Sequence, residues 1–260
     1  MNRPAVMITG AAKRIGAEIA KAFGQAGWHV IIHYGRSAEE AEALAAELPS
    51  AEAIHCDLAD SDGAVALVKS LAGRIDNWRA LINSASIFRY DNATDIDRAT
   101  YNRSMIINAK TPARMAQAYL AHARAEGGRR VIHVTDQKLE NSNPDFFSYT
   151  MSKHALSATI AMLADGAAGP DDRVYGLAPG AILASHDQTA DETDQSHVLN
   201  LLQRKTEASE ISEAMLFLAE GHLANGETLF VDSGQHLLDQ PRDVIYLARE
   251  TENHTQAEGA

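Results

Sequence analysis

The sequence contains little cysteine, no long apolar run and fewer basic than acidic residues, and each absence excludes a class of protein. Its 260 residues include one cysteine, Cys56, so no disulfide can form within the chain, and we interpret Cys56 as a small buried thiol. A formal net charge of -12 disfavours binding to nucleic acid and to anionic membranes. No stretch approaches the length of a membrane span, and the N-terminus carries no secretion signal. We therefore expect a cytoplasmic protein that acts on a small molecule.

Motifs of several common catalytic classes are also missing. The sequence has no HExxH, no GxSxG and no Walker motif. Its 11 histidines include His29 and His33, but these flank a predicted strand. A rise of about 3.3 Å per residue along a strand holds them too far apart to share one ion. We predict no metal site.

The residues that are present predict a single α/β domain. Apolar residues make up 45% of the chain and charged residues 22%, which allows a full core. Strands are predicted over residues 5–9, 30–32, 53–56, 80–82, 131–134, 174–177 and 228–231, and helices over 15–26, 61–71, 101–125, 149–163 and 211–219, with a further helix after Ser37. This alternation predicts a doubly wound, Rossmann-type sheet of seven parallel strands that binds its ligand at the carboxyl ends of the strands. Pro112 is expected to kink or restart the helix that contains it.

Two segments stand apart from this alternation. The polar stretch 183–204 carries four acidic residues and follows the sixth strand, where a substrate lid would lie; a plain solvated loop is the alternative. Residues 240–260 follow the last strand. We therefore expect a domain over residues 1–239 and a C-terminal tail over 240–260, packed near residues 244–247 and frayed beyond Glu250.

The turn after the first strand is a candidate phosphate site. Gly10 allows a sharp turn off the strand, Gly16 allows the next helix to pack close to the sheet, and the helix N-terminus offers N–H groups to a pyrophosphate. At the end of the second strand, where an NAD site carries an acid for the ribose, stand Arg36 and Ser37. A cation and a hydroxyl suit a 2′-phosphate, so we predict NADP(H) as cofactor, with Arg14 as a second cation.

Polar residues follow other predicted strands. Asp57 ends the third strand, where a carboxylate can accept from an adenine amino group; capping of the next helix is its alternative role. Asp136 follows the fifth strand, with a turn cap as the alternative, and Asn108 lies in the long helical stretch before that strand. Tyr149 and Lys153 are four residues apart and share one face of a predicted helix. The ammonium is expected to lower the pKa of the phenol, which would let Tyr149 deliver a proton near neutral pH.

The order of these motifs resembles the short-chain dehydrogenase/reductase family over residues 5–238. The motifs that carry the resemblance are TGxxxxxG from Thr9 to Gly16, Asp57-Leu58, Asn83-x-Ala85, Asn108, Asp136, the YxxxK pair and Pro179-Gly180. Within that family the chain is most similar to the pteridine reductases, including dihydromonapterin reductases. Its first turn reads TGAAKRIG, with Arg14 in place of the usual central glycine. The second strand runs into HYGRSAEEA, close to the pteridine-reductase HYxRSxxEA, and Asp136 stands where most of the family has serine.

This resemblance implies a reaction and a proton relay. Reduction of a pterin C=N bond needs hydride at carbon and a proton at nitrogen. A serine hydroxyl suits a substrate carbonyl, whereas a carboxyl beside a tyrosine can relay a proton to a ring nitrogen. The relay implied by the family consists of Asp136, Tyr149 and Lys153, with Asn108 holding a water that leads to Lys153.

The same resemblance implies the binding residues. For the pterin these are Arg14, Ser86, Phe88, Asp136 and Tyr149, with Phe88 stacking on the ring; a core-filling aromatic is the alternative for Phe88. The implied cofactor contacts are Gly10, Arg14, Ile15, Gly16, Tyr34, Arg36, Ser37, Asp57, Leu58, Asn83, Ser84, Ala85, Tyr149, Lys153, Pro179 and Gly180. A homotetramer is also implied.

The chain departs from the family pattern in places. Ser84 replaces the family's second asparagine, which predicts weaker or backbone-mediated cofactor binding there, and Tyr175 replaces a frequent asparagine. The C-terminal tail has no counterpart. Two alternative functions remain: a carbonyl or 3-oxoacyl-thioester reductase of the same family, and a non-catalytic NADP(H)-binding sensor.

Overall fold

A computed structural model describes residues 3–185 and 188–250, so Asp187 of the predicted lid and the tail beyond Glu250 lie outside the described residues. Seven strands form one sheet in the order β3-β2-β1-β4-β5-β6-β7, and every neighbouring pair is parallel. The strands are β1 (Ala5–Ile8), β2 (His29–Tyr34), β3 (Ala51–His55), β4 (Trp78–Asn83), β5 (Arg130–Val134), β6 (Arg173–Pro179) and β7 (Thr228–Val231). The predicted doubly wound, seven-stranded fold is confirmed.

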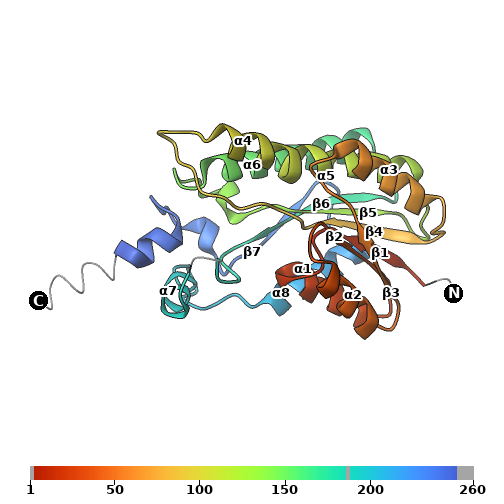
Figure 1. Ribbon diagram of the computed structural model, residues 1–260, viewed down its shortest axis with the longest axis horizontal. Coiled ribbons are helices and arrows are strands. Elements are labelled where there is room, and N and C mark those ends of the chain that lie inside the picture. Colours follow the sequence, from red (N-terminus) through yellow and green to blue (C-terminus); the bar gives the residue numbers. More distant parts are fainter. Residues whose placement is uncertain (1–2, 186–187, 251–260) are drawn as a thin grey trace, which may run out of the picture.

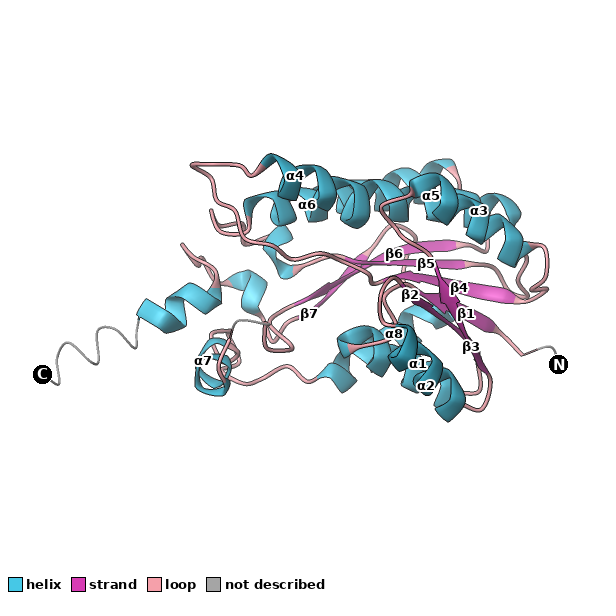
Figure 2. Ribbon diagram, in the orientation of Figure 1, coloured by secondary structure: helices cyan, strands magenta, loops and turns pink. Residues whose placement is uncertain are grey.

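Helices cover both faces of this sheet (Figures 1 and 2). One layer contains α1 (Arg14–Gln25), α2 (Ala38–Glu47) and α8 (Ala208–Glu220), and the other contains α3 (Ser61–Ala72), α4 (Arg98–Ser104), α5 (Thr111–His122) and α6 (Phe147–Gly166). Short helices η2 (Gln137–Leu139), α7 (Ala190–Ser196) and η3 (Gln235–Leu237) lie in the connections. Among the described residues, no helix combines the length and apolar character that a membrane span requires.

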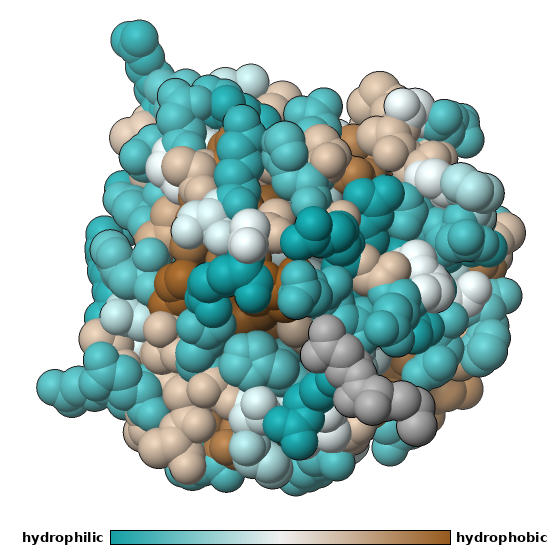
Figure 3. Space-filling model, turned by 90° about the vertical axis from the view of Figure 1, so that its right-hand side faces the viewer, coloured by the Kyte–Doolittle hydropathy of each residue, from teal (hydrophilic) through white to brown (hydrophobic). Residues whose placement is uncertain are grey.

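The core consists of two apolar clusters, one on each face of the sheet. Along β1 the side chains alternate: Val6 and Ile8 belong to the cluster under α1 and α8, and Ala5 and Met7 to the cluster under α3, α5 and α6. This alternation follows from the two-residue period of a strand. Both sets are buried because a parallel sheet has helices on both faces. The end of the molecule near the N-terminus is, by contrast, mostly hydrophilic, with apolar side chains interspersed (Figure 3).

The helix predicted over residues 101–125 is interrupted. A π-helix, η1 (Met105–Lys110), separates α4 from α5, and Pro112 lies in the first turn of α5. Proline has no N–H, and its ring crowds the carbonyl four residues earlier, which here belongs to Asn108. The α-helical hydrogen bonds therefore restart at Pro112, as predicted, and the wider π turn falls on Asn108.

The lid segment and the tail have more structure than the sequence predicts. The polar stretch contains α7, which begins with a capping box between Thr189 and Glu192. Residues 244–250 of the tail are helical, and this last helix lies beside α7, with Arg249 Nε donating to Glu192 Oε1 at 2.6 Å (Figure 1). The tail therefore packs against the lid segment.

Candidate active site

The predicted catalytic residues meet at the carboxyl end of β5. Asp136 follows this strand, and Tyr149 and Lys153 lie on the first turns of α6. The Tyr149 hydroxyl donates to Asp136 Oδ2 at 2.5 Å. Lys153 Nζ donates to the Val134 carbonyl at 2.7 Å and lies 5.5 Å from the centre of the Tyr149 ring. Tyr149 and Lys153 are both buried, so the group is compact and is a candidate site for proton transfer.

The sequence predicts a lowered pKa for Tyr149, but in the structure this pKa is raised. Burial and then the adjacent Asp136 raise the pKa of Tyr149 well above its ordinary value. Lys153 does not oppose this because its ammonium points to the Val134 carbonyl and not to the phenol oxygen. Burial also raises the pKa of Asp136 and lowers the pKa of Lys153 to about 8. The phenol therefore keeps its proton and shares it with a carboxyl group that itself takes up protons readily.

Asn108 connects α6, which carries Tyr149 and Lys153, to the segment that follows β4. Its side-chain amide donates to the Ile87 carbonyl and accepts from the Ile87 N–H, at 2.9 and 2.8 Å. The same amide nitrogen donates to Ser152 Oγ, beside Lys153, at 3.0 Å. Asn108 thus positions the segment after β4 against α6, while its predicted role in a water relay stays a prediction.

The first turn forms a close backbone cradle where the strand order reverses between β1 and β4. Gly10 has a φ of +68°, and a Cβ there would lie 2.9 Å from Ala85 Cα. At Gly16 a Cβ would lie 2.3 Å from the Gly10 carbonyl oxygen, which explains why α1 needs glycine here. Thr9 Oγ1 accepts from the N–H groups of Ser84 and Ala85, both at 3.0 Å, and so joins the ends of the two strands.

A buried histidine that sequence reasoning missed supports this cradle. The Gly10 N–H donates to His33 Nδ1 at 3.1 Å, and His33 Nε2 in turn donates to the Cys56 carbonyl at 3.0 Å. Burial lowers the pKa of His33 to about 4, so the ring stays neutral and can both accept and donate. The motif HYGRS contains this residue, but its position in a strand gave no separate sign of the contact.

Substitution of Gly10 by alanine is expected to destabilise the protein strongly. The positive φ costs about 1–2 kcal/mol for any residue with a Cβ, and the contact with the Ala85 backbone adds about as much again. Gly27→Ala is the matched control, because Gly27 has a φ of +86° but no described atom within 4 Å of the point where a Cβ would lie. Chemical unfolding of both variants should give a loss at Gly10 about twice that at Gly27. Equal losses would contradict the close approach.

Basic residues gather around the cradle. Arg14 takes a left-handed backbone, φ +56°, and its guanidinium donates to the carbonyls of Leu183 and Ala184, so the turn contacts the segment after β6. Lys13 pairs with Glu40 of α2 at 2.6 Å. Arg36 is exposed beyond the end of β2.

The next two predicted cofactor residues lie at the neighbouring strand ends. Ser37 precedes α2, yet among the described residues its hydroxyl makes no capping hydrogen bond to the helix. Asp57 accepts from the Ala59 N–H at 2.9 Å, whereas Asp60 is the residue that caps α3. Helix capping, the alternative role for Asp57, is therefore filled by Asp60.

Asn83 is directed into the sheet. Its amide nitrogen lies 3.2 Å from Nδ1 of His133 on β5, and its amide oxygen has no hydrogen-bond partner in the described part of the chain. Burial lowers the pKa of His133 to about 3, so this pair is neutral. A cofactor contact by Asn83 stays a prediction.

A cavity of about 440 Å³ opens between the cradle, the catalytic group and the lid segment. The predicted site residues that line it are Gly10, Arg14, Ile15, Gly16, Ser84, Ala85, Ser86, Phe88, Asp136, Tyr149, Lys153, Pro179 and Gly180. Those that do not line it, within the described ranges, are Tyr34, Arg36, Ser37, Asp57, Leu58, Asn83 and Asn108. The first group therefore shares one cavity, and the second surrounds it or lies along the strand ends.

Phe88 stands at the wall of this cavity. One face of its ring stacks on Phe146, with centroids 3.9 Å apart and planes 20° apart. Phe88 and Tyr149 meet edge to face, with ring centroids 4.7 Å apart. Phe88 is partly exposed and not a core-filling residue. Its place beside Tyr149 suits a flat ligand.

The cavity also has walls that sequence reasoning did not assign. His197, next to α7, lines it from the lid segment, and burial lowers the pKa of its imidazole. Asp243, Val244 and Ile245 line it from the tail. No motif pointed to these residues, since only the folded chain brings them to the site. Within residues 3–185 and 188–250, no three His, Cys, Asp or Glu side chains gather as a metal site would require.

Comparison with known proteins agrees with this geometry. A family model described as enoyl-(acyl carrier protein) reductase matches residues 10–236. The chain is 27% identical over 242 residues to granaticin polyketide synthase putative ketoacyl reductase 2 of Streptomyces violaceoruber, covering 90% of this chain and 97% of that protein. It is 28% identical over 279 residues to pteridine reductase 1 of Leishmania tarentolae, covering 90% and 96%.

A solved structure is similar over nearly the whole chain. The crystal structure of FolM alternative dihydrofolate reductase 1 from Brucella canis, complexed with NADP, is 32% identical and superposes with a TM-score of 0.85. The match covers 93% of this chain and 97% of that one.

Proposed function

This chain belongs to the short-chain dehydrogenase/reductase family, and we propose that it is an NADPH-dependent reductase of a pterin ring C=N bond. The observation that carries this proposal is the hydrogen bond of 2.5 Å between the Tyr149 hydroxyl and Asp136 Oδ2. It places a carboxyl group where most of the family has a serine hydroxyl. Similarity to pteridine reductase 1 and to the FolM enzyme supports the same substrate class.

The residues of the cleft fit NADP(H). Gly10 and Gly16 leave the backbone open for a pyrophosphate, and the start of α1 offers its N–H groups. Arg36, and Ser37, whose hydroxyl makes no capping hydrogen bond to α2, suit a 2′-phosphate. The similar structure from Brucella canis was solved with NADP. When bound, NADPH supplies the hydride of the reaction.

The proton comes from this chain's own residues. Tyr149 donates its proton to the ring nitrogen. Asp136, which accepts the hydrogen bond from Tyr149 and lines the cavity, takes up a proton from solvent and passes it back to the Tyr149 oxygen. The raised pKa of Asp136, caused by burial, makes this carboxyl a proton carrier closer to neutral pH. Lys153, held by the Val134 carbonyl, keeps a positive charge within the group and would bind the nicotinamide ribose.

The pterin would lie on the open side of Phe88. Phe146 covers the other face of that ring and makes it rigid. Ser86 and Arg14 line the same cavity and offer a hydroxyl and a cation to the polar edge of a pterin. A flat heterocycle with a polar edge matches a wall of this kind.

Steady-state assays of NADPH oxidation test the proposal. Dihydrobiopterin and dihydromonapterin are expected to be reduced, and an acetoacetyl thioester and a simple ketone to be poor substrates. No turnover with any dihydropterin would overturn the proposed substrate class. Turnover of the thioester or ketone, with pterins inert, would favour the second candidate, a carbonyl or 3-oxoacyl-thioester reductase, which the similarity to the granaticin ketoacyl reductase supports.

Arg36→Ala is expected to weaken NADPH binding about 10- to 100-fold, because a charge-assisted hydrogen bond to a phosphate is lost. NADH binding should not change, since NADH has no 2′-phosphate. Fluorescence titration with both cofactors measures the two constants. Arg98→Ala, at an exposed arginine of α4, is the control. An equal effect on both cofactors would place Arg36 elsewhere than at the 2′-phosphate.

A homotetramer and a cytoplasmic location complete the proposal. Met151 and Met162 of α6 are 38% and 63% exposed, and Phe217 of α8 is 44% exposed. Large apolar side chains on two helices of opposite layers suit two subunit interfaces. Light scattering coupled to gel filtration measures the assembly directly.

A further inference from the structure

The two ends of one loop carry the catalytic pair. Asp136 directly precedes the segment 137–148, called the 137–148 loop, which comprises η2, the connection to α6 and the first two residues of α6, and Tyr149 directly follows it. The conformation of this segment therefore sets the geometry of their hydrogen bond. The Lys138 N–H donates to Asp136 Oδ1 at 2.9 Å, which leaves Oδ2 for Tyr149. A loop of this length needs outside contacts to hold one conformation.

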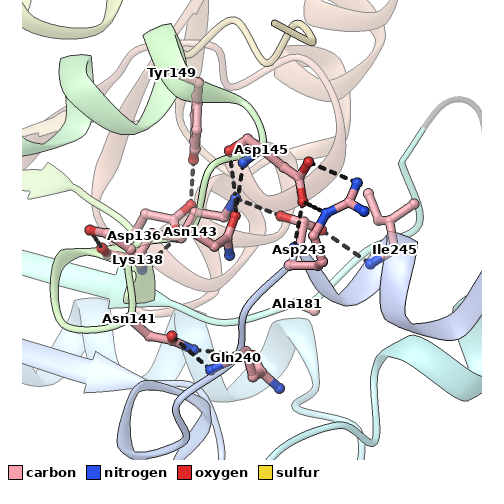
Figure 4. Close-up of polar contacts among 12 residues, drawn as sticks. Asp136, Lys138, Asn141, Asn143, Asp145, Tyr149, Ala181, Gln240, Asp243 and Ile245 are labelled. Carbon is pink, nitrogen blue, oxygen red and sulfur yellow. Dashed lines mark hydrogen bonds and ion pairs between the residues drawn. The ribbon is translucent and has the colours of Figure 1, made fainter. Parts of the chain in front are cut away.

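Those contacts come from the C-terminal tail. Lys138 Nζ pairs with Asp243 Oδ2 at 2.6 Å, and the two side chains are only 4% and 7% exposed (Figure 4). The ammonium also donates to Asn143 Oδ1 and to the Asp145 carbonyl, both at 3.3 Å, and lies 5.2 Å from the centre of the Phe146 ring. All its donors are therefore directed to the loop and the tail.

Two more polar contacts join the same segments. Arg242 donates to both carboxylate oxygens of Asp145, at 2.7 and 3.0 Å, and the Asp243 N–H donates to the same carboxylate at 3.0 Å. Asn141 and Gln240 exchange two hydrogen bonds, each 3.2 Å long (Figure 4). The tail is thus fixed to the loop at three successive points.

The tail then enters the site. Ile245 packs with Tyr149 and Phe146 in one buried apolar cluster, and Phe88 lies against that cluster. Val244 and Ile245 line the cavity, as do both members of the ion pair.

Stability alone does not explain such an ion pair. Desolvation of two buried charges offsets most of their attraction, and apolar replacements of similar volume are often neutral or stabilising. The position of the pair, close in sequence to Asp136 and at the edge of the cavity, points to the active site instead.

We propose that Lys138 and Asp243 are positioning residues, through which the C-terminal tail holds the 137–148 loop so that Asp136 faces Tyr149. The proposal rests on the proposed function only for the role of this pair in proton transfer. The charges of Lys138 and Asp243 act on Asp136 and Tyr149, and Lys153 of α6 is a further charge near these two residues. Lys138 also lies near the carboxylate of Asp145, whose charge is balanced by its ion pair with Arg242.

Opposite single substitutions test the proposal. Asp243→Asn leaves an unpaired ammonium near Asp136 and removes a negative charge near Tyr149, so the pKa of each should fall. Lys138→Met leaves an unpaired carboxylate, so the pKa of each should rise. The pH profile of kcat should therefore move by about one unit in opposite directions, with kcat about 10- to 100-fold lower and the KM for NADPH unchanged. The double variant K138M/D243N should return the profile towards that of the wild type.

A readout without substrate separates this inference from the proposed function. In protein labelled with [ζ-13C]tyrosine, the Tyr149 resonance is assigned by its loss in Tyr149→Phe and followed during a pH titration. The chemical shift of this resonance should change as Asp136 titrates, and the midpoint pH of that change should move in opposite directions in the two single variants. A wild type inert towards pterins and ketones would overturn the proposed function, and the NMR titration would still decide this inference.

Controls address folding and charge in general. Asp239→Asn, at an exposed position just before the tail, and Lys69→Met, exposed on α3, should change neither kcat nor the profile. Asp243→Glu keeps the charge and should recover most of the activity, even if Asp243→Asn folds poorly. Shifts in the same direction, or wild-type rates and spectra in both single variants, would overturn the proposal.

Discussion

Tyr149→Phe is expected to lower kcat for dihydropterin by about 10²- to 10⁴-fold, the range typical of a lost general acid. The phenylalanine keeps the ring that packs with Ile245 and Phe88 but removes the hydroxyl that donates to Asp136. NADPH affinity should change much less than kcat, because the cradle around Gly10 is unaffected and only one of the implied cofactor contacts, at Tyr149, loses a hydroxyl. Stopped-flow absorbance in a single turnover measures the chemical step separately from product release.

Tyr101→Phe, which removes a tyrosine hydroxyl from α4, an element distant in sequence from Tyr149, is the control and should have wild-type rates. The outcome that contradicts a catalytic role is specific. Turnover of dihydropterin by the variant at the wild-type rate would contradict a catalytic role of Tyr149. NADPH binding without turnover of any substrate by either protein would favour the non-catalytic NADP(H)-binding sensor.

Asp136→Asn should have the second largest effect, with kcat for dihydropterin lower by about 100-fold or more. The amide has nearly the shape of the carboxyl and can accept the hydrogen bond from Tyr149, but it cannot carry a proton. Asp136→Ser should also lose pterin reduction, while the ratio of ketone to pterin turnover rises by at least about 100-fold. Competition assays with both substrates measure this ratio.

Stability separates this loss from misfolding. Burial raises the pKa of Asp136 in the folded protein, so its ionised form opposes folding as the pH rises through that pKa. The amide never ionises, and Asp136→Asn should therefore unfold at or above the wild-type temperature at neutral pH. Asp165→Asn, exposed on α6, is the control. Wild-type pterin turnover by Asp136→Asn would refute the proton relay.

Local patterns predicted the fold well because local physics decides them. The apolar run from Ala5 to Ile8 is buried on both sides in a parallel sheet, and β7 has the bounds that its residues indicate. The polar lid stretch was harder, since α7 is a short helix whose capping box lies in a segment without apolar periodicity. In the site, spacing and the family resemblance together predicted a group of Asp136, Tyr149 and Lys153, and the structure brings these side chains together.

Three features of the site depended on contacts between distant residues. The direction of the Tyr149 pKa depends on burial and on where Lys153 points, and neither follows from four-residue spacing. His33 supports Gly10 across two strands. Pro112 predicted a restart of the helix, but not that the resulting π turn would aim Asn108 at Ile87.

The sequence by itself determined the order of strands and helices along the chain, the glycine cradle and the residues of the candidate catalytic group, because each depends on residue type and short spacing. Only the tertiary structure decided how these groups are tuned and which segment encloses them. Lys138 and Asp243 are far apart in the chain, and their ion pair exists because folding returns the tail to the loop between Asp136 and Tyr149. Burial, which residue type alone does not specify, also raises the pKa values of both Asp136 and Tyr149.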